Sequence, residues 1–232
     1  MEVVYEGKSK IVYKGETDGT FIIKYKDSAT AGNGAKKQEF AGKGAVNAKI
    51  TKILFELFEQ SGIETHYIKT IDETTVLVKK AEIVQVEVII RNIAAGSFSA
   101  RYGIPEGKIL PFPTVEHSLK SDALNDPLIN ESHILALELA SEKELKEMSE
   151  KALKINEIMK DFYKKANLTL VDFKLEFGRF ENRIILCDEI SPDSCRLWDS
   201  KTGQKLDKDI FRRDLGDLMT AYNEVLRRAT NV

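Results

Sequence analysis

The pattern of apolar and polar positions divides the chain into a first part made of short strands and a second part that mixes helices and strands. In the first part, β-branched or aromatic runs between turn residues predict six strands: Val3–Tyr5, Ser9–Lys14, Phe21–Tyr25, Tyr67–Ile71, Thr75–Val78 and Val84–Ile90. Apolar residues from Phe40 to Phe58 recur at three- and four-residue steps and predict one helix, which Gly62 ends. Together these residues predict an antiparallel sheet with one helix packed on it.

The second part carries two further helical patterns. Ser141 and Glu144 form a capping box ahead of an apolar stripe that runs from Leu145 to Phe162. A last helix is expected from about Lys208, and its apolar face comprises Phe211, Leu215, Leu218, Met219, Tyr222, Val225 and Leu226. The two parts are expected to pack together with a cleft between them, which is a common position for a ligand.

Three charged residues interrupt the apolar run at residues 170–178, which reads LVDFKLEFG. Side chains alternate between the two faces of a strand, so Asp172, Lys174 and Glu176 share one face and the apolar residues occupy the other. Charged groups in a largely apolar strand cost several kcal/mol each unless they are paired or bound. The pattern therefore indicates that these three side chains have a partner.

A second strand pattern, Ile184–Cys187, follows a polar turn around Asn182 and predicts an antiparallel hairpin. Counting back from the turn pairs Glu176 with Cys187 or Asp188, so that the carboxylates of Glu176 and Asp188 come together. Adjacent carboxylates repel unless a cation lies between them, and oxygen ligands of this kind suit Mg²⁺. The alternative is a surface hairpin whose acids pair with lysine and arginine.

Composition excludes several classes of protein. The 232 residues, 42% of them hydrophobic, suffice for one large or two small globular domains. Lys and Arg number 35 against 37 Asp and Glu, a net charge of −2, and no dense basic block predicts binding to nucleic acid. The N-terminus lacks the apolar core of a signal peptide, and no stretch approaches the roughly 18 apolar residues of a membrane span. We therefore expect a cytoplasmic protein with no nucleic-acid or membrane partner.

The cysteine and histidine residues do not predict a reactive site. Cys187 and Cys195 stand eight apart without the spacing of a zinc site, and both are expected to be reduced, with a disulfide between them as the alternative. His66, His117 and His133 are scattered and have no neighbours suited to a catalytic triad, so they are interpreted as structural or surface residues.

Two segments have the composition of phosphate-binding loops. Gly7 lies between two strand patterns and is followed by Lys8, Ser9 and Lys10, so backbone N–H groups and two ammonium groups can meet an anion. The same four residues also suit a plain hairpin turn with solvated lysines. The small-residue loop from Lys26 to Lys37 is expected either to close over a ligand or simply to be mobile.

Other polar residues are placed to bind an anionic substrate. Arg91 ends an apolar strand and can hold an anion with two N–H groups, while Ser97 is expected to cap the next short helix and to donate to phosphate. Arg196 closely follows the adjacent acids Asp188 and Glu189, where it can face the metal across the substrate. The alternative for Arg91 is to satisfy carbonyl groups at a domain boundary. The loop before Pro127 contains Lys120, Asp122, Asn125 and Asp126. These residues either include another cation ligand or only stabilise the turn.

Five segments taken together resemble the motifs of the SAICAR synthetase family of purine biosynthesis: YEGKSK, TAGNGAKK, VEVIIRNIAAGS, LVDFKLEFG and DEISPDSCRLWD. The resemblance covers essentially the whole chain in the same order. It implies an α+β fold in which residues 1–80 form an antiparallel sheet with a helix, similar to the small lobe of a protein kinase, that covers the nucleotide. Residues 81–232 are then a mixed α/β, ATP-grasp-like domain that carries the metal and ribotide sites and a C-terminal helix.

The resemblance also implies a reaction. Members of the family join L-aspartate to the carboxylate of carboxyaminoimidazole ribonucleotide and split ATP to ADP and phosphate with Mg²⁺. From the same resemblance we expect a homodimer or a higher homo-oligomer. Two other classes of function are less consistent with the chain. A kinase-like phosphotransferase would require an HRD-type catalytic loop, which is lacking, and would have no use for RNIAAGS. A non-catalytic nucleotide-binding protein would leave the charged face of LVDFKLEFG without a purpose.

The resemblance assigns site residues one by one. At the nucleotide, it implies a phosphate loop of Gly7, Lys8, Ser9 and Lys10, a hinge at the adenine with Lys79, a ribose-side lysine at Lys120, and magnesium ligands at Glu176 and Asp188. At the ribotide, it implies contacts from Arg91, Ser97 and Arg196, with Lys174 and Asp126 lining the same pocket and Asp209 and Arg212 nearby.

The catalytic roles that follow concern three residues. Lys10 and Lys174 are expected to draw charge onto the oxygens of the transferring phosphoryl group. Asp172 either orients Lys174 or faces a substrate. Asn33 stands where some family members carry Asp, so a carboxylate role does not transfer to it.

Overall fold

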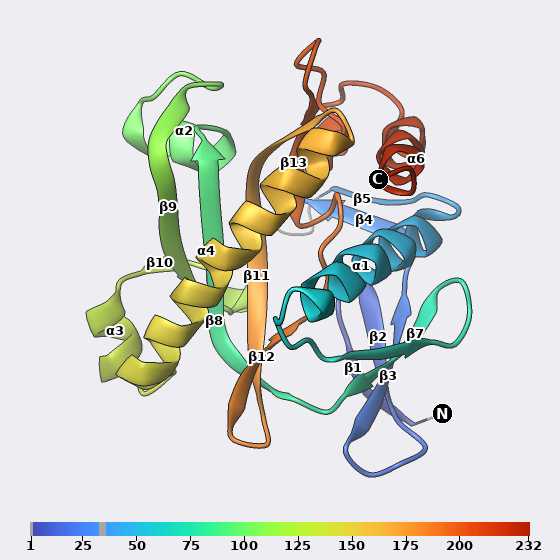
Figure 1. Ribbon diagram of the computed structural model, residues 1–232, viewed down its shortest axis with the longest axis vertical. Helices are drawn as coiled ribbons and strands as arrows, with labels where there is room; N and C mark the ends of the chain where they lie inside the picture. The colour runs from blue at the N-terminus through green and yellow to red at the C-terminus, as the bar shows by residue number, and fades with distance from the viewer. Residues whose placement is uncertain (1, 33–35) are drawn as a thin grey trace.

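The computed structural model describes residues 2–32 and 36–232 and has an α+β architecture built on antiparallel strands (Figure 1). The N-terminal sheet has the strand order β1-β2-β3-β7-β6. Its strands are β1 (Val3–Glu6), β2 (Lys10–Lys14), β3 (Thr20–Tyr25), β6 (Tyr67–Thr70) and β7 (Thr75–Lys79). These are the first five strands that the apolar pattern predicts, with slightly shifted ends. Asn33 lies outside the described residues.

The loop predicted from Lys26 to Lys37 is partly a β-ribbon. Strands β4 (Ser28–Ala31) and β5 (Lys36–Glu39) pair antiparallel, with Ala31 opposite Lys36. The sequence pattern missed this pairing because a backbone ladder satisfies its N–H and C=O groups without needing apolar side chains.

The second sheet supplies the surface on which most of the predicted site residues lie. Its order is β10-β9-β8-β11-β12, and β13 also pairs with β11. Its strands are β8 (Glu82–Ile93), β9 (Ile109–Leu119), β10 (Leu128–Ile129), β11 (Leu168–Phe180), β12 (Arg183–Cys187) and β13 (Cys195–Asp199). The central strand, β11, contains LVDFKLEFG and pairs antiparallel with β8, β12 and β13.

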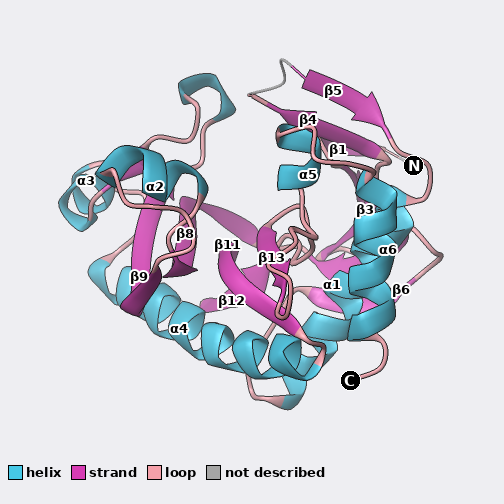
Figure 2. Cartoon of the chain, turned by 90° about the horizontal axis from the view of Figure 1, so that it is seen from above, coloured by secondary structure: helices cyan, strands magenta, loops and turns pink. Residues whose placement is uncertain are grey.

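The helices lie on and around the two sheets. They are α1 (Lys43–Gln60), α2 (Gly96–Tyr102), α3 (Glu131–Ala136), α4 (Glu142–Lys165), α5 (Asp209–Arg212) and α6 (Leu218–Ala229), with a 3₁₀ turn at Asp122–Leu124. Helix α4 crosses the sheet face, and α1 lies beside α6 (Figures 1 and 2). Residues of α1, α4, α6 and β11 share one apolar core, so α1 packs with elements beyond residue 80. The division of the chain at residue 80 stays a prediction.

The capping box of α4 is confirmed, because the Ser141 side chain accepts from the Glu144 N–H and the Glu144 side chain accepts from the Ser141 N–H. The single long helix predicted from Lys208 is wrong. Helix α5 ends at Arg212, and α6 starts only at Leu218, behind an Asp217 side chain that accepts from the Thr220 N–H. Asp214 and Gly216 adopt positive φ angles of 52° and 148°, which a helix cannot contain, and Leu215 is left 51% exposed.

Within the described part of the chain, no helix has the length and the apolar character that crossing a membrane requires.

Candidate functional site

A pocket of about 790 Å³ opens between the two sheets. Strands β8 and β11 contribute one wall, and the turn between β1 and β2 contributes the facing one. All the predicted site residues line it except Ser97 and Asp209. The fold therefore brings together residues from segments as distant in the sequence as Gly7 and Arg212.

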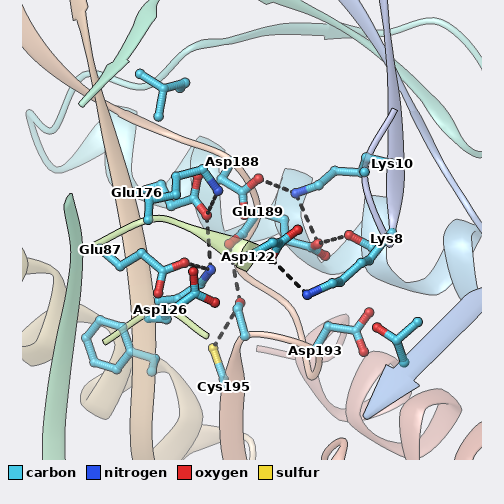
Figure 3. A pocket seen from close by; sticks show the side chains of 18 of the residues that line it. Lys8, Lys10, Glu87, Asp122, Asp126, Glu176, Asp188, Glu189, Asp193 and Cys195 are labelled. Carbon is cyan, nitrogen blue, oxygen red and sulfur yellow. Dashed lines mark hydrogen bonds and ion pairs between the residues drawn. The ribbon is translucent and has the colours of Figure 1, made fainter. Parts of the chain in front are cut away.

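The hairpin of β11 and β12 places the two predicted metal ligands. Glu181 and Asn182 have positive φ angles of 48° and 60°, which suit a two-residue turn whose twist matches the strands. Of the two predicted registers, the structure has Glu176 opposite Cys187. Asp188 follows the end of β12 with a φ of 64°, and Figure 3 shows it close to Glu176.

Lysines surround these acids. The Glu176 carboxylate accepts hydrogen bonds from Lys120 at 2.9 Å and from Lys174 at 3.0 Å. Lys10 donates to Asp188 and lies 3.1 Å from Glu189 (Figure 3). Three ammonium groups and three carboxylates thus meet at one end of the pocket, which we call the acid end.

The charges at the acid end reinforce each other. Burial alone would lower the pKa of the Lys174 ammonium, but Glu176 and Glu87 outweigh it and raise that pKa. The pKa of Lys10 is raised well above its usual range in the same way by Asp188 and Glu189. Burial would raise the pKa of Asp188, but Lys10 and Lys174 hold it below its usual range. The lysines therefore remain cationic at neutral pH and can compensate phosphate charge, but they cannot serve as bases.

The acid end has the ligand chemistry that Mg²⁺ requires. Glu176 and Asp188 offer carboxylate oxygens from the two strands of one hairpin. The described residues include no group of three or more His, Cys, Asp or Glu side chains that could hold a metal ion. Mg²⁺ commonly takes one or two carboxylates and completes its shell with water and phosphate oxygens, so Glu176 and Asp188 are residues that could hold it.

The turn between β1 and β2 is a hairpin turn that also faces the pocket. The Gly7 N–H donates to the Lys10 carbonyl at 2.9 Å, and the Ser9 hydroxyl donates to Glu189 at 3.3 Å. The Lys8 ammonium reaches Asp122 on the far side of the pocket mouth at 2.8 Å. These contacts draw the first sheet toward the second.

Lys79 is placed beside an apolar part of the pocket. Val12, Ile23, Val78 and Ile83 line this part. The Lys79 ammonium donates to Glu64 and to the Thr65 carbonyl, both at 2.9 Å. The segment just before β6 therefore holds this side chain, and a flat apolar group could lie against the neighbouring apolar side chains.

The other end of the pocket, which we call the arginine end, is organised by Asp172. Its carboxylate accepts from Arg91 Nη1 at 2.7 Å and from Arg196 Nη1 at 2.9 Å. Asp209 accepts from Arg196 Nε at 2.9 Å and from Arg212 at 2.8 Å, and Glu116 accepts from Arg91 Nε at 2.9 Å. The carboxylate joins two arginines, and because Asp172 lines the pocket, the predicted role of facing a substrate stays a prediction.

Asp209 stands behind the pocket rather than on its wall. Burial would raise its pKa, but Arg196 and Arg212 outweigh this and hold the pKa at about 2. Asp209 is therefore ionised and holds the Arg196 guanidinium through Nε, while Asp172 holds it through Nη1.

Ser97 reaches the site through Arg91, whose Nη2 donates to its hydroxyl at 3.3 Å. Its predicted role as a helix cap is wrong. Helix α2 begins one residue earlier, after an Ala95 N-cap that makes no side-chain bond, because Gly96 turns the chain with a φ of 52°. Asp126 lines the pocket and accepts from the Ser121 N–H at 2.8 Å, which closes the loop after Lys120.

Three acids of the pocket were not assigned from the sequence. Glu87 stands opposite Glu176 in the β8–β11 ladder and accepts from Lys174 at 2.5 Å. Its position in the apolar run VEVII was a signal of the same kind as that of Glu176. Glu189 accepts from the Ser191 hydroxyl at 2.8 Å. Asp193 had no local signal, because its partners Lys43, Asn47 and Tyr222 come from α1 and α6.

The cysteines and His66 lie in the interior. Cys187 and Cys195 are free and buried, and burial raises the pKa of both thiols. His66 lines the pocket, and burial lowers its pKa to about 4, so its ring is neutral at pH 7.

Comparison with known proteins places this geometry in a family. A family model described as SAICAR synthetase matches residues 3–229. A phosphoribosylaminoimidazole-succinocarboxamide synthase of Finegoldia magna is 56% identical over 98% of this chain and 99% of its own length. A crystal structure of the synthase from Ehrlichia chaffeensis has a TM-score of 0.97 and 40% identity, covering 100% of this chain and 99% of that chain. A SAICAR synthetase in complex with ADP has a TM-score of 0.96 and 48% identity, covering 100% and 98%.

Proposed function

This chain belongs to the SAICAR synthetase family, and we propose that it joins the amine of L-aspartate to the carboxylate of carboxyaminoimidazole ribonucleotide at the expense of ATP. The products are the succinocarboxamide ribotide, ADP and phosphate. One observation carries the proposal for the site: a single pocket has an acid end suited to metal-bound phosphates and an arginine end suited to a second anionic substrate.

The acid end takes the nucleotide. Gly7, Lys8, Ser9 and Lys10 lie over its phosphates, while Lys79 and the apolar residues beside it meet the adenine, and Lys120 the ribose. Glu176 and Asp188 would hold Mg²⁺, which would neutralise phosphate charge when bound. The relative that binds ADP supports this assignment.

The chemistry requires an activated carboxylate. A carboxylate is a poor acyl donor because its leaving group would be oxide, so ATP first transfers its γ-phosphoryl group to a carboxylate oxygen. The aspartate amine then attacks the acyl carbon, forms the C–N bond, loses a proton and expels phosphate. Lys10 and Lys174 stabilise the negative charge on the phosphoryl oxygens, and their raised pKa values keep them cationic throughout.

The arginine end takes the ribotide. Arg91, Ser97 and Arg196 bind its phosphate and carboxylate, and Lys174 and Asp126 line the side toward the nucleotide. Arg212 adds a further cation at the pocket wall. Asp172 and Asp209 act as positioning residues, because their bonds fix the guanidinium groups before the substrate arrives.

We extend the proposal to the setting of the enzyme. Two buried free thiols suit the reducing cytoplasm. The exposed apolar residues Tyr102, Ile109 and Phe112 on α2 and β9 support a homodimer or a higher homo-oligomer, which light scattering of the purified protein tests.

The reaction is tested by incubating the protein with ATP, Mg²⁺, L-aspartate and carboxyaminoimidazole ribonucleotide while measuring ADP and the amide product. We expect equal amounts of both, and neither when aspartate is left out. ADP formation that does not depend on aspartate would contradict the proposal.

A variant pair tests the assignment of Lys174 in the same assay. Lys174→Met should lower kcat about 100-fold or more, as loss of a group that stabilises developing charge does. Lys146→Met serves as the matched control, since that side chain is 77% exposed on α4, and it should keep full activity. Equal activity of the two variants would remove Lys174 from the mechanism.

A further inference from the structure

Gly96 lies against the guanidinium group of Arg196. Helix α2, which begins at Gly96, stands at the end of β8 (Figure 1). A Cβ atom added at Gly96 would meet the Arg196 side chain, with Cζ at 2.7 Å and Nη1 at 3.1 Å, and Nη2 closer still. Carbon atoms pack at about 3.5–4.0 Å, so no side chain fits at this position while Arg196 keeps its place.

The other contacts of Arg196 leave one N–H edge for a ligand. Nε donates to Asp209 and Nη1 donates to Asp172. Among the residues that the structure describes, none accepts a hydrogen bond from Nη2. Nη2 is the Arg196 atom nearest to a Cβ at Gly96, and it is also the nitrogen that remains available to an anion in the pocket.

We propose that Gly96 is a positioning residue for the ribotide, because its missing side chain lets the Arg196 guanidinium lie flat against the start of α2 with Nη2 directed at the substrate. The inference rests on the proposed role of Arg196 in ribotide binding. A methyl group at this position moves the flexible end of Arg196 rather than the apolar core, so it weakens ribotide binding and also strains the bonds from Arg196 to Asp172 and Asp209.

The chain contains a matched control for this change. Gly96 and Gly103 open and close the same helix with φ angles of 52° and 62°, so alanine meets a similar backbone cost at both. A Cβ at Gly103 has no atom within 4 Å. Only the contact with Arg196 separates Gly96→Ala from Gly103→Ala.

The experiment measures melting temperature, kcat, the KM values for each substrate, and the Kd of the ribotide by calorimetry without ATP. Gly103→Ala should lose a few degrees of melting temperature from the backbone alone. Gly96→Ala should lose more, because moving the Arg196 guanidinium weakens its bonds to the buried carboxylates of Asp172 and Asp209. Only Gly96→Ala should raise the KM and Kd of the ribotide, by about 10- to 100-fold, because that is the effect of losing one hydrogen bond from a charged group. Its KM for ATP should stay unchanged. Ribotide constants that match those of Gly103→Ala would overturn the inference.

Two further variants separate this inference from the role of Arg196 itself. If Arg196→Gln leaves the KM of the ribotide unchanged, the proposed function of Arg196 fails. If Arg196→Gln raises that KM and Gly96→Ala does not, only the inference about Gly96 fails.

The Arg196→Ala background provides a test that holds even if Gly96→Ala folds poorly. With the guanidinium removed, adding Gly96→Ala should cost no more melting temperature than adding Gly103→Ala, and it should not raise the ribotide Kd further. A larger loss in that background would show that the alanine methyl group conflicts with something other than Arg196, and the inference would be wrong.

Discussion

The charge balance of the arginine end depends on Asp172, and replacing it with asparagine tests this directly. Asp172 is 4% exposed, and its carboxylate accepts hydrogen bonds of 2.7 Å from Arg91 and of 2.9 and 3.1 Å from Arg196. Asparagine has nearly the same shape but loses the charge, and its amide N–H group faces a guanidinium that also donates.

The expected cost follows from burial. Removing one partner of a buried ion pair costs about 3–5 kcal/mol because the other charge stays in a poorly solvated place. Arg91 keeps Glu116 and Arg196 keeps Asp209, so the lower end of the range, about 3 kcal/mol, applies here. A chain of this size loses about 2–4 °C of melting temperature per kcal/mol, which gives a decrease of about 6–12 °C.

The assay is urea denaturation, because guanidinium chloride would screen the ion pairs under study. Asp122→Asn is the control, because it also breaks an ion pair, the one between Asp122 and Lys8. The Asp122 side chain is 60% exposed, so losing this pair should cost less than about 1 kcal/mol. Inorganic phosphate should recover part of the stability of Asp172→Asn by supplying the missing negative charge. If the free energy of unfolding of Asp172→Asn lies within about 1 kcal/mol of that of Asp122→Asn, the reasoning from buried charge is refuted.

Two further predictions concern the acid end and the α4 cap. Glu176→Gln and Asp188→Asn should each raise the Mg²⁺ and ATP concentrations needed for half-maximal rate far more than they change the melting temperature, and activity that survives both changes would refute the metal assignment. Arg179 and the N-cap of α4 lower the pKa of Glu144 to about 2, so its contribution to stability is present above the unfolded pKa near 4.5 and is lost as the pH falls toward 2. Glu144→Gln should therefore cost about 1 kcal/mol at pH 7, with the difference shrinking below pH 4.5 in acid denaturation; a difference that is constant with pH would contradict this.

Features that depend on neighbours in the chain could be predicted from the sequence. The alternation of LVDFKLEFG placed Asp172, Lys174 and Glu176 on one face of β11, and the short turn set the register of the hairpin to within one residue. The capping box marked the start of α4. In each case the period of a strand, the length of a turn or the spacing of a cap determines the outcome locally.

Some local predictions failed where the backbone conformation, not the pattern of apolar side chains, determined where a helix begins or ends. The apolar stripe after Lys208 continued through Leu215, but positive φ angles at Asp214 and Gly216 divide it into α5 and α6. The start of α2 moved to Gly96 for the same kind of reason.

The choice of partners was decided only by the tertiary structure. The sequence placed charges on β11, but it could not show that Lys174 pairs with Glu87, that Asp172 joins Arg91 to Arg196, or that the Arg196 guanidinium rests on Gly96. Asp193 and Lys43 lie far apart in the chain and meet where the loop before β13 packs against α1 and α6, since Tyr222 of α6 also donates to Asp193. Such pairings have no period in the sequence, since each depends on how separate elements pack, and that packing determines which charges end buried together.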